Sequence, residues 1–104
     1  MEEKKVVTLD LTGCKYLGEI HQRIKQAFDF PDFYGENWDA FWDLLNEPRE
    51  NTVVMVYGLT KLPKKLESSG KMIVDLLEEN KVYYDNFMSW QSRFERYFDY
   101  KIVN

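Results

Sequence analysis

The most constraining feature of the sequence is an unbroken apolar run in the middle of the chain, Thr52 to Tyr57. Its residues (Thr, Val, Val, Met, Val, Tyr) are mostly β-branched or aromatic, and the run is too short for an ordinary helix. Runs of this kind without polar alternation are typical of a strand that is covered on both faces. We therefore expect a central strand, buried on both faces, with the rest of the chain arranged around it.

Segments with a helical period separate this run from two further strand-like segments. Residues 6–11 alternate polar with apolar side chains and predict a strand, as do residues 98–102 near the other end. Apolar residues at three- and four-residue spacing predict a helix over 17–28. A loop is expected at 29–35, where a proline and a glycine break the pattern.

More helices are expected on both sides of the central strand. Asn37 can cap a helix that runs to about Asn46, just before a proline. Downstream, a helical turn at 62–66 leads into a third helix, capped by one of two serines and ending at Asn80. Aromatic residues between 87 and 97 again have helical spacing. Strands separated by helices favour crossover connections, and the sequence therefore predicts an α/β fold with a small parallel sheet.

Length and composition predict one domain, residues 1–104, because a chain of this size can bury one core. No apolar run approaches the roughly 20 residues that span a membrane, and the charged amino end is unlike a secretory signal. Cys14 is the only cysteine, which fits a reducing compartment and a small buried residue. We expect a cytoplasmic protein.

The net charge of −4 is concentrated in one window. Between Asp29 and Glu50, seven carboxylates stand against a single base, Arg49, whereas the rest of the chain has eleven acids and thirteen bases. A patch of one sign steers partners of the opposite sign. The alternative reading is an acidic helix that simply faces solvent.

The helix expected over 37–46 divides this window into two faces. Its apolar face carries Trp38, Phe41 and Leu45. Asp39 and Asp43 fall on the opposite face, and the amino end of the helix stabilises the negative charge of Asp39. Trp42 falls at the border, where it serves either a partner or the edge of the core.

This stretch resembles the signature of the barstar family, the intracellular inhibitors of ribonucleases. The resemblance is carried by Tyr34-Gly35-Glu36-Asn37, Asp39-Ala40, Trp42-Asp43 and Leu45. It extends more weakly from Ile20 to about Glu79, and residues 81–96 look like an insertion. The resemblance implies a three-stranded parallel sheet packed by helices. It also implies that the second helix and the preceding loop block the basic active site of a small, barnase-like ribonuclease.

The same resemblance implies which residues bind the partner. Asp43 would be the central anchor, supported by Asp39 and Glu79. The full implied set is Phe33, Gly35, Asn37, Asp39, Trp42, Asp43, Asn46 and Glu79. Phe33 and Asn46 differ from the tyrosine and threonine of the best-known family member, which leaves the identity of the target open.

Catalysis is a weaker interpretation. Asp39, Asp43 and Glu79 could be read as an acid/base set, but no nucleophile is paired with a base. His21, the only histidine, lies at an apolar helical position, where a structural role is expected. No Cys/His spacing predicts a metal site. We expect no enzyme activity, no cofactor and no metal.

Two further alternatives concern the partner. Nucleic-acid binding is not expected, because Trp38 and Trp42 lie in the acidic window and stacking platforms work beside positive grooves. The aromatic segment 87–100 is better read as core, although a small RNA-binding role there stays open. The serious rival is a general interaction module that binds a basic partner other than a nuclease. We expect a monomer when the protein is free.

Overall fold

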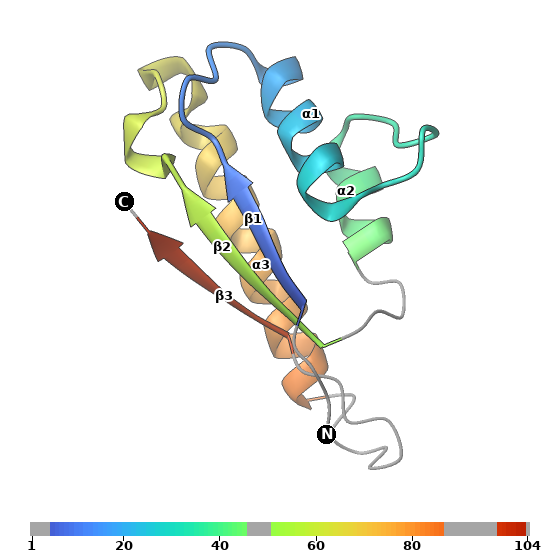
Figure 1. Cartoon of the computed structure of the whole chain (residues 1–104). Helices are drawn as coiled ribbons and strands as arrows, with labels where there is room; N and C mark the ends of the chain where they lie inside the picture. Colours follow the sequence, from blue (N-terminus) through green and yellow to red (C-terminus); the bar gives the residue numbers. More distant parts are fainter. Residues whose placement is uncertain (1–4, 46–50, 87–97, 104) are drawn as a thin grey trace.

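The structure, a computed structural model, describes residues 5–45, 51–86 and 98–103 (Figure 1). Along the chain the elements are β1 (Lys5–Asp10), α1 (Leu17–Phe28), α2 (Trp38–Leu45), β2 (Thr52–Tyr57), the short 3-10 helices η1 (Leu59–Lys61) and η2 (Lys64–Leu66), α3 (Glu67–Asn86) and β3 (Phe98–Val103). The expected helix over 87–97 and the expected end of the second helix at Asn46 lie outside the described residues.

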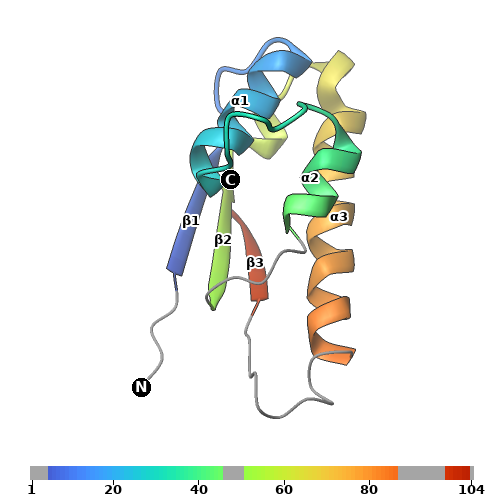
Figure 2. The same ribbon diagram turned by 90° about the vertical axis from the view of Figure 1, so that its right-hand side faces the viewer.

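The three strands form one parallel sheet in the order β1-β2-β3, which confirms the predicted fold class. Val54 of β2 is paired with Val7 on one side and with Tyr100 on the other. Because each connection moves to the next strand in the same direction, right-handed crossovers place every helix on the same face of the sheet. Figure 2 shows the helices gathered on that face.

The core lies between this face of the sheet and the helices. β1 and β2 contribute Val7, Leu9, Val54 and Val56; the helices contribute Ile20, Ile24, Phe28, Phe41, Ile73 and Leu77, all buried. Cys14 is also buried, as expected for a lone small apolar residue. The burial of α1 and α2 along one stripe each explains their three- and four-residue spacing of apolar side chains.

β2 is the central strand, as expected, but it is not buried on both faces. Val54 and Val56 are fully buried, whereas Val53, Met55 and Tyr57 on the outer face are only half-buried. The reason is topological: both crossovers run over one face, so no described helix covers the other. The prediction that β2 is buried on both faces, which rested on its unbroken apolar run, was therefore wrong for the outer face.

α3 is longer than the sequence pattern predicted. It begins at Glu67 directly after η2 and continues to Asn86, past the expected end at Asn80. No proline or glycine interrupts residues 81–86, and the Lys81 ammonium lies 3.4 Å from the Asp99 carboxylate of β3. The first part of the segment interpreted as an insertion therefore extends a helix of the core fold.

Candidate functional site

The loop between α1 and α2 holds one aromatic ring out to solvent. α1 ends at Asp29, which adopts a left-handed backbone (φ 55°), and the Phe30 amide then donates to the carbonyl of Lys25. Phe30 and Tyr34 are both buried, whereas Phe33 between them is 78% exposed. Because buried rings pin the loop on both sides, the Phe33 side chain is presented at its tip.

A buried histidine braces this loop against both helices. His21 of α1 is hydrogen-bonded through Nδ1 to the Tyr34 hydroxyl at 2.7 Å, and its ring centroid lies 4.6 Å from that of Trp38 in α2. Burial lowers the pKa of His21 and raises the pKa of Tyr34, so the bond joins a neutral imidazole to a protonated phenol. The predicted structural role of His21 is confirmed.

Asn37 fixes the start of α2. Its side-chain oxygen accepts from the Ala40 amide at 2.8 Å, and its side-chain nitrogen donates to the Gly35 carbonyl at 3.2 Å. A Cβ on Gly35 would lie 3.1 Å from that nitrogen, tighter than most real contacts. Gly35 and Asn37 thus shape the loop and the start of α2.

α2 exposes carboxylates on the face opposite the core. Phe41 and Leu45 are buried, while Asp39 and Asp43, four residues apart, are exposed on the other side. Among the described residues, neither carboxylate forms an ion pair or hydrogen bond. Trp42 is half-buried at the border, as its position predicted. We call the side of α2 that carries Asp39 and Asp43 the acidic face.

Glu79 lies on α3, which runs beside α2 in both views (Figures 1 and 2). Lys81 and Glu78 contact Asp99 and Tyr100, so their side of α3 faces β3. Glu79 is exposed and points to the flank of α3 away from β3, because successive helical residues are turned by about 100°. Asn46, the remaining member of the implied set, lies outside the described residues.

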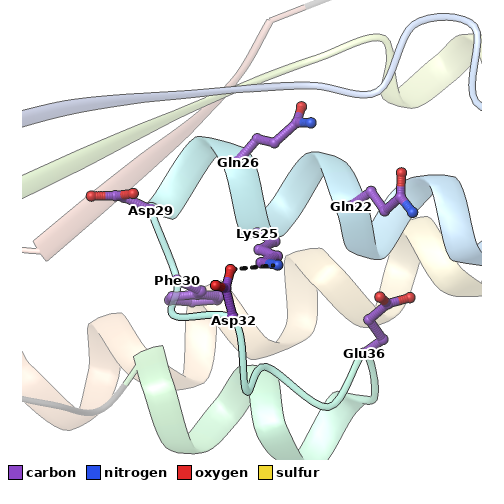
Figure 3. Close-up of a pocket in the computed structure, with 7 residues that line it drawn as sticks. All are labelled: Gln22, Lys25, Gln26, Asp29, Phe30, Asp32 and Glu36. Atoms are coloured by element: carbon purple, nitrogen blue, oxygen red, sulfur yellow. Dashed lines mark ion pairs between the residues drawn. The ribbon is translucent and has the colours of Figure 1, made fainter.

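A polar surface pocket of about 320 Å³ lies between α1 and the loop that follows it (Figure 3). It is lined by Gln22, Lys25, Gln26, Asp29, Phe30, Asp32 and Glu36. Figure 3 shows Lys25 of α1 reaching across to Asp32 of the loop, with 3.2 Å between the charged atoms. Asp32 is thus paired within the chain, unlike Asp39 and Asp43.

Within the described residues, no group of three or more His, Cys, Asp or Glu side chains could hold a metal ion. No helix in this part of the chain is long and apolar enough to cross a membrane. The candidate site is therefore the acidic face of α2, together with the exposed Phe33 of the preceding loop.

The fold and the site together define a small parallel α/β protein whose second helix exposes carboxylates. The family described as "Barstar (barnase inhibitor)" matches residues 4–97, and the chain belongs to this family. A Bacillus subtilis (strain 168) protein named "Putative ribonuclease inhibitor YrdF" is 54% identical over 39 residues. That match covers 38% of this chain and 43% of the relative, less than half of either. Membership of the family supports a barstar-like inhibitor role.

Sequence reasoning missed the brace that His21, Tyr34 and Trp38 form across α1, the loop and α2. Two polar rings in the sequence could have indicated this brace. His21 lies beside Ile20 in the helical pattern and Tyr34 follows the loop proline, and both positions are expected to face the core. Two such groups buried in one core are expected to satisfy each other, since an unpaired buried polar atom is costly.

Proposed function

We propose that this chain inhibits a small basic ribonuclease by placing the acidic face of α2 and the preceding loop in the nuclease active site. The observation that carries the proposal is the pair of exposed carboxylates, Asp39 and Asp43, without an internal partner on a helix whose other face is core. Charges that are fixed in place but not neutralised within the chain are suited to a partner of opposite sign.

The chemistry of the target explains why carboxylates serve this purpose. A ribonuclease binds the phosphates of its substrate with Lys, Arg and His side chains, and carboxylates form strong charge-assisted hydrogen bonds with the same groups. Asp43 is the proposed anchor, with Asp39 and Glu79 in support. Because the brace and the Asn37 cap hold α2 before binding, little ordering entropy is lost when the complex forms.

Apolar contact completes the proposed interface. Phe33 is exposed at the loop tip and Trp42 is half-exposed beside the carboxylates, and aromatic anchors contribute much of the binding energy in protein interfaces. Gly35, Asn37 and Asn46 complete the proposed contact set.

The proposal is an inhibitor without catalytic activity. The only histidine is buried and bound to Tyr34, so it is not available as a general base at the acidic face. Burial raises the pKa of the Cys14 thiol, which disfavours the nucleophilic thiolate. The proposal includes residues 1–104 as one binding domain that needs no cofactor, acts in the cytoplasm and is monomeric when free.

The experiment is capture of ribonucleases from the source cell on immobilised protein, followed by an RNA-cleavage assay of the captured enzyme with added inhibitor. The test variant is Asp39→Ala/Asp43→Ala. The matched control is Glu67→Ala/Asp75→Ala, which removes two exposed carboxylates from α3. We expect the control, but not the test variant, to capture and inhibit a nuclease.

A basic partner that is not a nuclease is the rival outcome. It predicts capture that Asp39→Ala/Asp43→Ala abolishes, with no RNA cleavage by the captured protein. Capture of a nuclease that is equally strong with both variants would instead refute the acidic face as the contact surface.

A further inference from the structure

A second exposed charged surface lies at the end of the molecule where β1 and β2 finish. It consists of residues 12–16, which follow β1, and residues 58–71, which follow β2 and enter α3; we call it the basic end. Figure 1 shows these segments together at one end of the molecule. They are in direct contact: a Cβ on Gly58, which has φ 78°, would lie only 2.5 Å from the Thr12 backbone nitrogen. Glycine permits this close approach.

The charge of the basic end is opposite to that of the whole chain. Its two segments contain one carboxylate, Glu67, and five lysines, a net charge of +4. The lysines are Lys15, Lys61, Lys64, Lys65 and Lys71, and all are exposed. None of their ammonium groups forms an ion pair with a residue that the structure describes.

The carboxylates that border the basic end are used by backbone amides. Asp10 accepts a hydrogen bond from the Thr12 amide at 2.9 Å. Glu19 accepts from the amides of Lys15 and Tyr16, at 2.9 and 3.2 Å, and so caps α1. These hydrogen bonds fix the loops, and the charges of Arg23 and Lys61 also help to lower the pKa of Asp10, but no lysine of the basic end forms an ion pair with either carboxylate.

An aromatic ring lies among these lysines. The Tyr16 side chain is 63% exposed, and the Lys65 ammonium lies 4.6 Å from the centre of its ring. Lys64 and Lys71 are two helical turns apart on one side of the η2–α3 segment, roughly 11 Å along the axis. The ring and the lysines therefore combine a stacking surface with a row of cations.

We propose that the basic end binds single-stranded RNA, with its lysines on the phosphates and Tyr16 stacked on a base. Single strands are bound by positive surfaces that track the backbone and by aromatic rings on which bases stack. The site shares no residue with the acidic face and does not depend on the proposed inhibition.

The observations favour an RNA strand over a membrane surface. A peripheral membrane helix turns an apolar face outward, whereas α3, which carries Lys71, buries Ile73 and Leu77 in the core.

The experiment measures fluorescence anisotropy of a labelled oligouridine 12-mer with the full chain at about 50 and 200 mM salt. The test variant is Lys64→Glu/Lys65→Glu. The matched control, Lys5→Glu/Lys101→Glu, makes the same charge change on exposed strand lysines outside the basic end. We expect the test variant to bind at least about tenfold more weakly, and the control to bind within about threefold of the wild type. Loss of two phosphate contacts should reduce the salt slope of log K by about 1.4.

Tyr16→Ala separates stacking from charge. It should weaken binding about five- to hundredfold and leave the salt slope unchanged. Lys64→Glu/Lys71→Glu, which spares the Lys65 contact with Tyr16, gives a second charge variant, and circular dichroism checks that each variant is folded. The proposal is overturned if the oligomer does not bind at 50 mM salt or if the control loses as much affinity as the test variant. Stronger binding to anionic phosphatidylserine vesicles or to polyglutamate than to the oligomer would overturn it too.

Discussion

The acidic face and the basic end are two surfaces of opposite sign built in different ways. Asp39 and Asp43 come from one helix of the chain, α2, within a short stretch of sequence. The lysines of the basic end come from two segments, 12–16 and 58–71, that are far apart in the sequence and meet only because β1 and β2 are neighbours in a parallel sheet. The fold thus gives a chain of net charge −4 a surface that binds anions.

Charges elsewhere in the described chain are used differently. Lys25 is paired with Asp32, Lys81 with Asp99, and Glu78 accepts from the Tyr100 hydroxyl at 2.7 Å. Burial and the bond to Glu78 raise the pKa of Tyr100 to about 12. Exposed pairs of this kind add little stability. In the acidic face and the basic end, by contrast, side chains of one sign lie together, and Asp39, Asp43 and the lysines form no ion pair with a described residue.

The largest expected effect separates the two surfaces by function. Asp39→Lys/Asp43→Lys should abolish ribonuclease inhibition, because each lost carboxylate costs about 2–5 kcal/mol, a range measured in part on barstar and barnase themselves, and the new lysines repel the basic active site. Lys64→Glu/Lys65→Glu should leave inhibition unchanged. The measurement is the inhibition constant of both variants against the captured ribonuclease.

Equal loss of inhibition by both double variants would contradict this separation and would favour a general effect of net charge. Glu67→Lys/Asp75→Lys, which makes the same charge change as the acidic variant on α3, controls for that effect.

The next effect tests the support of the acidic face. Phe41→Ala removes a fully buried ring from the core side of α2 and should lower the free energy of unfolding by about 3–5 kcal/mol. Urea unfolding measures it. Tyr16→Ala, at the exposed ring of the basic end, should change stability by less than about 0.5 kcal/mol. A loss below about 1 kcal/mol for Phe41→Ala would mean that α2 is not anchored through this ring.

The sequence predicted the acidic face well because everything that makes it lies close together. The period of α2 separates Phe41 and Leu45 from Asp39 and Asp43, and Asn37 marks where the helix begins. The strand order could be inferred in part from the alternation of strands and helices. Inhibition itself rested on the resemblance to a family, because an acidic helix alone has many uses.

What depends on contacts between distant segments could not be predicted in this way. Lys64 and Lys65 are close to Glu67 in the sequence, but their proximity to Tyr16 arises only in the folded chain, where the Lys65 ammonium lies over the Tyr16 ring. Likewise, the hydrogen bond between His21 and Tyr34 requires that α1 and the loop pack together first. The outer face of β2 is only half-buried because of the handedness of two crossovers, which composition does not encode.

A smaller effect concerns the cap of α2. Asn37→Ala removes the acceptor of the Ala40 amide and should cost about 1 kcal/mol of stability. Asn37→Asp keeps that acceptor and should retain most of the stability in urea unfolding. If Asn37→Ala weakens inhibition by more than its effect on stability explains while Asn37→Asp restores it, the cap also positions the acidic face. Equal stability of the two variants would exclude the capping role.

The smallest expected effect is a pH dependence of stability through His21. Its pKa in the folded protein is lowered by burial, so the unfolded chain binds a proton more readily as the pH falls below about 6.5. Above that value both states are neutral and the contribution to stability is complete. Below it the folded state is progressively destabilised, by less than about 1 kcal/mol at pH 6.

His21 is the only histidine, so its titration in the folded chain can be followed by NMR without assignment ambiguity. The expected result is an imidazole pKa below 6.5 together with a matching loss of unfolding free energy between pH 7 and 6. His21→Gln should flatten that pH dependence, even though the substitution itself costs stability. Because His21 braces the loop and α2 but touches nothing in the basic end, acidification should weaken ribonuclease inhibition before it affects RNA binding. An imidazole pKa at or above 6.5 would show that the buried bond to Tyr34 does not favour the neutral ring, and the brace would then hold the acidic face equally well when protonated.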